Sequence, residues 1–193
     1  MPQLTAQIRI DRPGLPTVSA SPYPVPMYGL AHVTRLLSLS EDPANPSAER
    51  IVEALARVRR IAVVGLSRDP AKAASHVPSY LAAKGYDVIP VNPNADRIFG
   101  RQALARLDLV TDPVDLVLVF RPSAEAGVVV RAAAARPEAP VIWLQEGIRA
   151  DREATEARSR GLMVVQDLCI FKAHRAVEAE LTAPDALPHQ NPR

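Results

Sequence analysis

Short apolar runs recur along this chain from residue 61 onward, and helical segments separate them. The runs that predict strands lie at residues 61–64, 87–91, 115–120, 141–144 and 162–166. The run that ends at Phe120 is apolar without interruption, which is typical of a strand buried on both faces of a sheet. The pattern therefore predicts five strands.

The segments between these runs carry helix signals, at residues 75–84, 123–136 and 151–160. Gly85 and Gly161 are expected to stop the first and the last of these helices. Pro78 is expected in a first helical turn, where its missing N–H is tolerated. Strands that alternate with helices imply right-handed crossovers and a parallel sheet. The predicted fold class is α/β: a Rossmann-like, doubly wound, five-stranded parallel sheet with helices on both faces.

A further helix is expected just before the first strand. Asn45 is predicted as its N-cap and Pro46 as its first residue, where the missing N–H costs nothing. Glu49 then places a negative charge at the positive end of the helix dipole. Its apolar face is formed by Ile51, Val52, Leu55 and Val58. A shorter helical period at residues 30–39 predicts a small helix that packs on the domain.

The two ends of the chain differ in composition from its centre. Residues 1–26 hold six prolines and no helical or strand period, so they are predicted to be a mobile arm, and Met27 is an alternative translation start. The tail has three prolines and little apolar content, which predicts disorder. The predicted organisation is an arm with a short helix at residues 1–46, a binding domain at 47–181 and a tail at 182–193.

The composition argues against several classes of function. A net charge of +2 without a basic cluster disfavours nucleic-acid binding. No apolar run approaches the ~20 residues that a membrane-spanning helix needs. The single cysteine, Cys169, cannot form an intramolecular disulfide and fits a reducing compartment. With no signal-peptide pattern, we expect a cytoplasmic protein without nucleic-acid or membrane partners, as a monomer or weak homodimer.

Each predicted strand is followed by residues suited to ligand binding. In an open parallel sheet, ligands bind outside the carboxyl ends of the strands, where the strand order reverses. The segments that follow the strands are residues 65–75, 92–94, 121–123, 145–147 and 167–169. We therefore expect these five segments to converge on one edge of the sheet.

The first of these segments has the features of a phosphate-binding loop. Gly65 allows a sharp turn and a close approach of the backbone to a phosphate, although simple turn geometry also explains a glycine here. Ser67 supplies a hydroxyl, and Arg68 and Lys72 supply positive charge. Either cation alone is equally well explained as a solvated surface residue. Together with the helix that follows, the loop predicts a site for a pyrophosphate.

The loop does not match the NAD fingerprint. A G-x-G-x-x-G pattern from Gly65 requires glycines where Ser67 and Pro70 stand. The acidic residue that would hold the ribose is missing from the end of the second strand, where Asn92 stands, and Asp87 lies at the opposite end of that strand. Asn92 can still donate to and accept from a ribose or an adenine, so that contact stays open.

Five motifs, in this order along residues 50–176, carry a resemblance to a known family. They are Val64-Gly-Leu-Ser67, Gly85-Tyr-Asp-Val-Ile-Pro-Val-Asn-Pro93, Val119-Phe-Arg121, Trp143-Leu-Gln-Glu-Gly-Ile148, and Val165-Gln-Asp-Leu-Cys-Ile170 with His174-Arg175. In these motifs the chain resembles the small stand-alone CoA-binding domain proteins, whose fold is shared with the CoA-binding domain of the succinyl-CoA synthetase α subunit.

The resemblance implies binding of coenzyme A without an established reaction. Carried over by position, the loop after the first strand would hold the pyrophosphate, Asn92 and Pro93 would border the adenosine, and Phe120 and Arg121 would flank the ligand. The complete set of candidate binding residues is Gly65, Leu66, Ser67, Arg68, Lys72, Ser75, His76, Asn92, Pro93, Phe120, Arg121 and Gln145.

Few residues suggest catalysis. Cys169 falls just past the last predicted strand, on the side of the expected ligand site, which suits a mixed disulfide with the CoA thiol or redox sensing, but a buried apolar role is favoured. Asp167 and Glu146 lie at neighbouring strand ends, where capping is favoured over an acid–base pair. No metal-ligand spacing and no G-x-S-x-G motif occurs. The sequence favours a non-catalytic module that binds CoA or an acyl-CoA. The alternative is an NAD(H)-binding, redox-responsive or dehydrogenase-like protein on the same fold.

Overall fold

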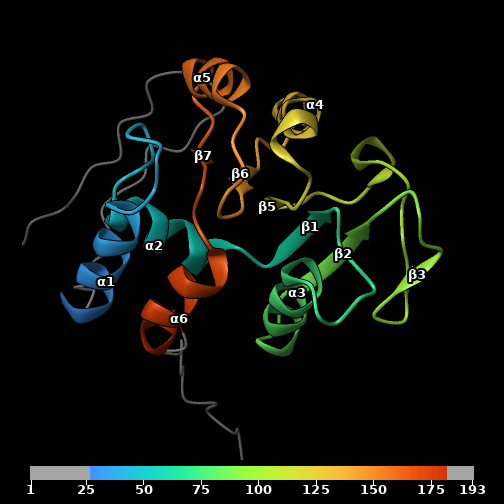
Figure 1. Cartoon of the computed structure of the whole chain (residues 1–193), viewed down its shortest axis with the longest axis horizontal. Coiled ribbons are helices and arrows are strands. Elements are labelled where there is room, and N and C mark those ends of the chain that lie inside the picture. Colours follow the sequence, from blue (N-terminus) through green and yellow to red (C-terminus); the bar gives the residue numbers. More distant parts are fainter. Residues whose placement is uncertain (1–26, 182–193) are drawn as a thin grey trace, which may run out of the picture.

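A computed structural model describes residues 27–181 and contains one five-stranded sheet (Figure 1). Its strands are β1 (Arg60–Val64), β2 (Asp87–Val91), β5 (Leu116–Val119), β6 (Val141–Leu144) and β7 (Val164–Val165). They lie in the order β2-β1-β5-β6-β7, and every neighbouring pair is parallel. The predicted α/β class and the five-stranded parallel sheet are confirmed.

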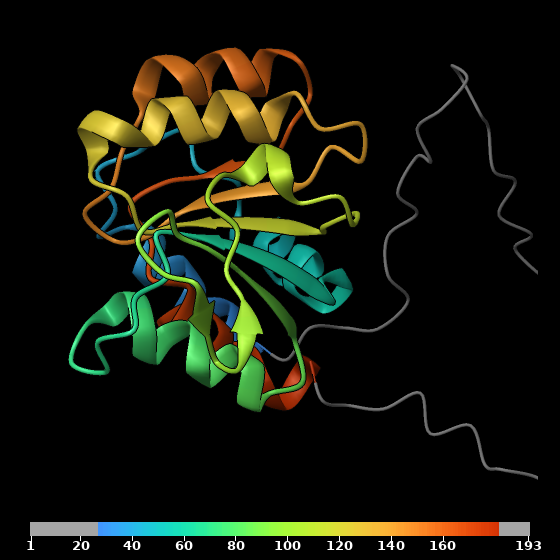
Figure 2. The same ribbon diagram turned by 90° about the vertical axis from the view of Figure 1, so that its right-hand side faces the viewer.

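Helices cover both faces of the sheet (Figure 2). On one face lie α4 (Ser123–Ala134) and α5 (Asp151–Ser159). The other face carries α1 (Met27–Leu37), α2 (Ala48–Arg57), α3 (Ala73–Ala83) and α6 (Ile170–Leu181). None of the helices in residues 27–181 is long and apolar enough to cross a membrane.

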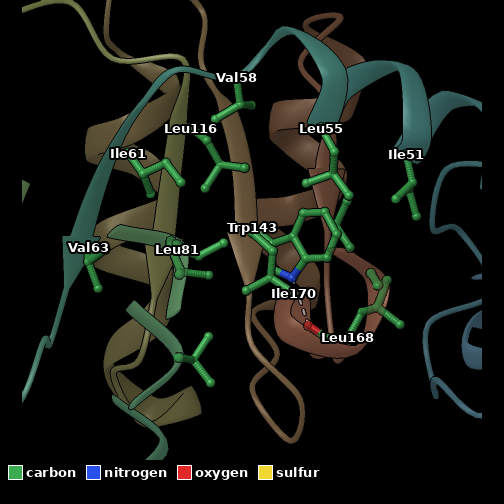
Figure 3. Packing of buried hydrophobic residues seen from close by; sticks show 14 of the residues in the cluster. Ile51, Leu55, Val58, Ile61, Val63, Leu81, Leu116, Trp143, Leu168 and Ile170 are labelled. Atoms are coloured by element: carbon green, nitrogen blue, oxygen red, sulfur yellow. Dashed lines mark hydrogen bonds between the residues drawn. The ribbon is translucent and has the colours of Figure 1, made fainter. Parts of the chain in front are cut away.

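Each face of the sheet has its own apolar core, because alternate strand residues point to opposite sides. Ile61, Val63 and Leu118 belong to the cluster beneath α3 and α6, whereas Ala62 and Val117 belong to the cluster beneath α4 and α5. Trp143 is fully buried at the centre of the first cluster (Figure 3). Its indole N–H donates to the Leu168 carbonyl at 2.7 Å, so the ring packs without leaving a polar atom unpaired.

The start of α2 differs from the prediction. The helix begins at Ala48 with Ser47 at the N-cap position, and Pro46 lies outside it. The Asn45 amide instead donates to the Gln166 carbonyl at 2.8 Å and accepts from the Gln166 N–H at 2.8 Å. The Asn45 side chain therefore bonds to Gln166, which is distant in sequence, and not to the start of the helix as the N-cap prediction requires.

Pro78 also lies elsewhere than predicted. α3 starts at Ala73, so Pro78 stands in the helix interior rather than in its first turn. The predicted start at residue 75 placed it too close to the N-terminus. An interior proline costs a helix about 3 kcal/mol relative to alanine, so its position here calls for a specific explanation.

Four further elements lie outside the predicted set. The segment after β2 forms a hairpin of β3 (Arg97–Ile98) and β4 (Arg101–Gln102), followed by the short 3-10 helix η1 (Leu107–Leu109). The chain returns beside β2, where Leu104 bridges to Val91. α6 follows the last strand, and that strand is shorter than the predicted run at 162–166.

The segment before α2 packs on the rest of the chain. α1 lies against α6, and Val33 of α1 is fully buried in the core beneath the sheet. We therefore propose that the folding unit begins at α1. The predicted arm at 1–26 and tail at 182–193 lie outside the described residues.

Candidate functional site

The strand order reverses between β1 and β5. β2 lies on one side of β1 and β5 on the other, so the segments that follow β1 and β5 diverge at the carboxyl edge of the sheet. Such a switch point is where open α/β sheets bind ligands. The two flanking segments are the β1–α3 loop (residues 65–72) and the short connection from Phe120 to Pro122.

Gly65 packs directly against the connection after β5. Its φ is +89°, and a Cβ at this position would lie 3.1 Å from the Arg121 Cδ and 3.2 Å from the Phe120 carbonyl carbon. Glycine is therefore needed both for the backbone conformation and for the approach of the neighbouring segment. The space that a side chain would fill here is occupied by Phe120 and Arg121, a different reason for the glycine than contact with a phosphate.

Side-chain turns shape the β1–α3 loop. The Ser67 hydroxyl accepts the Asp69 N–H at 3.1 Å, and the Asp69 carboxylate accepts the Ala71 N–H at 3.0 Å. The Asp69 carbonyl accepts the Lys72 N–H at 3.1 Å. These bonds are the turns that serine and aspartate form with their own backbone, and they give the loop a defined conformation.

Three longer-range hydrogen bonds anchor the loop. The Gly65 N–H donates to the Val91 carbonyl at 2.9 Å, and the Ser67 N–H donates to the Ala74 carbonyl at 2.9 Å. The Asn92 amide nitrogen donates to the Leu66 carbonyl at 2.8 Å. The loop is thereby fixed to β2, to α3 and to the segment after β2.

Asn92 is partly engaged by these contacts. Its side-chain oxygen accepts the Asn94 N–H at 2.8 Å, and its nitrogen holds Leu66. An amide group has two N–H donors and two lone pairs on oxygen, so half of its capacity stays available. The contact of Asn92 with a ribose or an adenine remains a prediction.

Four backbone N–H groups around the loop have no acceptor anywhere in residues 27–181. They belong to Leu66, Arg68, Ala73 and Ala74. Ala73 and Ala74 form the first turn of α3, where unpaired N–H groups and the helix dipole together attract an anion. Arg68 and Ala73 are exposed, so water can satisfy their N–H groups until an anion takes its place.

The cations near the loop differ in their engagement. Arg68 is exposed and makes no ion pair within the described chain. The Lys72 side chain is 67% exposed, and its nearest carboxylate, Asp69, is 4.0 Å away. Arg121 pairs with Glu125 one turn along α4. Surface pairs of this kind contribute little free energy, so Lys72 and Arg121 can leave them, and all three side chains can bind an anion.

The other predicted site residues take varied positions. Pro93 and His76 are exposed, Phe120 is half-buried, and Ser75 is buried in the first turn of α3. The Leu66 side chain is fully buried in the core, so only its backbone can meet a ligand. Gln145 is also buried.

Gln145 holds the start of α6. Its amide oxygen accepts the Ile170 N–H at 3.0 Å, and its nitrogen lies 3.4 Å from the Cys169 sulfur. Cys169 is itself buried, with its side chain against this amide. These contacts favour a structural interpretation of both residues.

The two acidic residues considered for acid–base chemistry are engaged as well. Asp167 accepts the N–H of Glu41 at 2.8 Å and the N–H of Gly147 at 2.7 Å. Glu146 forms an ion pair with Lys172 at 2.8 Å, and the carboxylate raises the pKa of that lysine. Asp167 holds loops in place, as capping would require, whereas the Glu146 pair lies on the exposed surface.

A buried polar network, which the sequence did not reveal, closes the carboxyl end of β7. Asp42 is almost fully buried, accepts a hydrogen bond from Gln166 at 2.9 Å and pairs with Arg158 at 2.7 Å. Burial alone raises the pKa of Asp42, but the bonds from Arg158, Gln166 and the Ala44 N–H outweigh it and hold that pKa below its usual value. The Gln166 amide oxygen also accepts the Ala150 N–H at 2.6 Å.

A second buried cluster joins α3 to α6. His174 lies between two tyrosine hydroxyls, with Tyr80 at 2.9 Å from Nδ1 and Tyr86 at 3.0 Å from Nε2. A neutral imidazole donates with one nitrogen and accepts with the other, so it suits both tyrosines. Burial lowers the pKa of His174, and burial together with Glu178 raises the pKa of Tyr80 to about 12.

Two hollows in the surface lie at the opposite edge of the sheet. One of about 340 Å³ is bordered by Val58, Pro113 and Pro140, just before β1, β5 and β6. Another of about 400 Å³ lies before β7 and shares Arg50 and Met163 with the first. We place the candidate site at the carboxyl edge, because the open N–H groups and the cations Arg68, Lys72 and Arg121 are there.

The region that a known family model matches contains all five strands of the sheet. Residues 59–175 match the model of the family described as "CoA binding domain". The protein YneT of Bacillus subtilis, described as uncharacterized, is 38% identical over 130 residues, which cover 67% of this chain and 96% of YneT.

Two solved structures extend the comparison. The cell-free ID.343 protein of Thermus thermophilus is 34% identical, with a TM-score of 0.63, over 67% of this chain and 97% of that protein. The dinucleotide-forming acetyl-coenzyme A synthetase 1 of Ca. Korarchaeum cryptofilum is 25% identical, with a TM-score of 0.51. That match covers 60% of this chain and 28% of the synthetase.

Proposed function

The chain belongs to the CoA-binding domain family, and from this premise we propose that it binds coenzyme A or an acyl-CoA at the carboxyl ends of β1 and β5. In this proposal the β1–α3 loop and the first turn of α3 receive the pyrophosphate. Asn92 and Pro93 border the adenosine, and Phe120 and Arg121 flank the ligand from the next strand. The module itself catalyses no reaction.

One observation carries this proposal: four backbone N–H groups without acceptors in residues 27–181 gather around the β1–α3 loop, beside the exposed cations Arg68 and Lys72. A pyrophosphate offers several acceptor oxygens and a negative charge, which match such a group of donors at a helix N-terminus. Arg68 and Lys72 add charge where the diphosphate would lie.

The engagement of the polar residues at β6 and β7 supports a non-catalytic role. Gln145, Asp167 and Glu146 each bond to backbone or to a neighbouring side chain at the same edge. A general acid or base needs a proton-transferring atom within reach of the substrate. In these residues the side-chain oxygen and nitrogen atoms that could transfer a proton are already engaged in hydrogen bonds or an ion pair.

The test is a calorimetric titration of the full chain with CoA, dephospho-CoA, NAD and ATP, each under the same conditions. We expect CoA to bind and NAD to bind far more weakly, because Asn92 stands where NAD-binding domains carry an acidic residue. Tight binding of NAD without binding of CoA would contradict the proposal. It would support the NAD(H)-responsive alternative instead.

A further inference from the structure

The interior proline of α3 has an unusual neighbour in the β1–α3 loop. In a regular helix the carbonyl of Ala74 accepts the N–H of residue 78, four positions later. Pro78, inside the helix, has no N–H, and a proline ring in a regular helix crowds the carbonyl four residues before it. The Ala74 carbonyl is therefore without its normal helical partner.

That carbonyl accepts a hydrogen bond from outside the helix. The Ser67 N–H donates to it at 2.9 Å. The carbonyl of the N-cap residue Lys72, by comparison, accepts the N–H groups of Ser75 and His76 within the helix. Of these two carbonyls at the start of α3, the one that bonds to the loop belongs to Ala74, four positions before the proline.

This contact matters because of where Ser67 stands. Leu66 and Arg68, its two neighbours in sequence, are the loop residues with open backbone N–H groups. Fixing the Ser67 N–H to α3 restricts how the peptide groups on either side of it can turn. The contact also holds the loop against the first turn of the helix, where Ala73 and Ala74 present their own open N–H groups.

We propose that Pro78 is a positioning residue for the ligand site: by leaving the Ala74 carbonyl unpaired within α3, it lets that carbonyl hold Ser67 and so fixes the β1–α3 loop. Pro78 is buried in the helix interior and touches no ligand itself. The effect on affinity rests on the proposed binding of CoA, whereas the effect on the loop does not. A purely structural role for Pro78, as a core residue beside Val77 and Leu81, is the competing explanation.

Two variants of the full chain separate these explanations. Pro78→Ala and Pro78→Val both restore an N–H at position 78, which then competes with Ser67 for the Ala74 carbonyl. Valine fills the space of the proline ring and adds about one methyl group, whereas alanine leaves a small gap. Ser79→Ala is the matched control, because Ser79 is exposed on the same helix and its N–H is unchanged.

Amide hydrogen exchange of Ser67, followed by NMR without ligand, reports on the loop. We expect exchange about threefold to tenfold faster in both Pro78 variants, as the loss of one hydrogen bond implies, and no change in Ser79→Ala. The CoA dissociation constant should rise by a similar factor in both. The melting temperature should stay level or rise, since the helix regains a bond.

Other results overturn the inference. Unchanged Ser67 exchange in both variants shows that Pro78 does not position the loop. Faster exchange with unchanged CoA affinity shows that the loop position is irrelevant to binding. A loss of melting temperature in Pro78→Ala that Pro78→Val reverses, together with wild-type affinity, identifies a packing role. A wild-type chain that fails to bind CoA contradicts the proposed function, while the exchange measurement still decides the role of Pro78 in the loop.

Discussion

The carboxyl edge of the sheet has two halves of opposite character. At β1 and β5, the open half, four backbone N–H groups lack acceptors in the described chain, Arg68 forms no ion pair there, and Lys72 meets Asp69 at 4.0 Å. At β6 and β7, the closed half, side chains accept several of the loop N–H groups: Asp167 holds Gly147, and Gln166 holds Ala150.

The difference suggests that one half of this sheet edge serves stability and the other half serves ligand binding. Parallel strands of the same sheet deliver loops to both halves, so topology alone does not separate them. Buried carboxamide and carboxylate groups form hydrogen bonds at several positions of the closed half, which favours stability. In the open half such hydrogen-bonding capacity is left for a ligand. We therefore expect substitutions in the two halves to affect different properties.

Removing a buried charge from the closed half should have the largest effect. In Asp42→Ala, Arg158 loses its carboxylate partner and Gln166 loses an acceptor, so we expect the free energy of unfolding to fall by about 2 to 4 kcal/mol. CoA affinity should stay as in the wild type. Denaturant unfolding and calorimetry measure the two quantities.

The matched control is Asp108→Ala, which breaks an exposed ion pair with Arg106. Such a pair contributes about 0 to 1 kcal/mol. Equal losses of stability in Asp42→Ala and Asp108→Ala would show that the network does not stabilise the closed half.

Removing charge from the open half should do the reverse. We expect Arg68→Ala and Lys72→Ala each to weaken CoA binding by about 1 to 3 kcal/mol, where the contact is charge-assisted, with unfolding unchanged. Arg57→Ala is the control, because Arg57 is an exposed arginine at the opposite edge and has no ion pair within the described chain. Unchanged affinity in both loop variants would show that Arg68 and Lys72 are solvated surface residues with no part in CoA binding.

Acid should weaken the contact between α3, which starts in the open half, and α6, which starts in the closed half. Because the pKa of His174 is lowered in the folded chain, the unfolded chain binds more protons at that histidine. Its contribution is therefore complete above the ordinary histidine pKa of about 6.5 and is lost as the pH falls below it. We expect the wild type to lose more stability than His174→Gln between pH 8 and pH 5.5. Equal losses in denaturant titrations would rule out this role.

The smallest effect is expected from shortening the chain to begin at Met27. All strands and both segments of the open half lie within residues 27–181, so we expect the shortened chain to fold and to bind CoA like the full one. Thermal melts and CoA titrations of the two chains measured together provide the check. A melting temperature lower by several degrees would mean that residues 1–26 contribute to the fold.

The sheet could be predicted because its strands are apolar runs between helical segments, a pattern that depends on local sequence. The β1–α3 loop could be located for the same reason, since it follows the first strand. Asn45 shows the limit of such reasoning: a local rule makes it a helix cap, but Gln166, far along the chain, holds its side chain. The two-residue strands of the β3–β4 hairpin are too short to produce a pattern at all.

The candidate site shows the same limit at single residues. Gly65 was expected from the turn, but its packing against Phe120 and Arg121 depends on strand order. Gln145 follows a strand as the binding residues do, yet it turns towards Cys169 and Ile170. A residue that follows a strand lies at the carboxyl edge of the sheet. Whether it remains available for a ligand depends on the neighbouring residues that it contacts there.

The most direct test of the two-halves account is a CoA titration of the isotope-labelled chain, followed by amide chemical shifts. The account predicts the largest changes at residues 65–75, with further changes at 92–94 and 120–123. Residues 40–45 and 166–169 should hardly change. Shifts concentrated in the closed half, or no shifts at saturating CoA, would contradict the claim that the open half is the binding site.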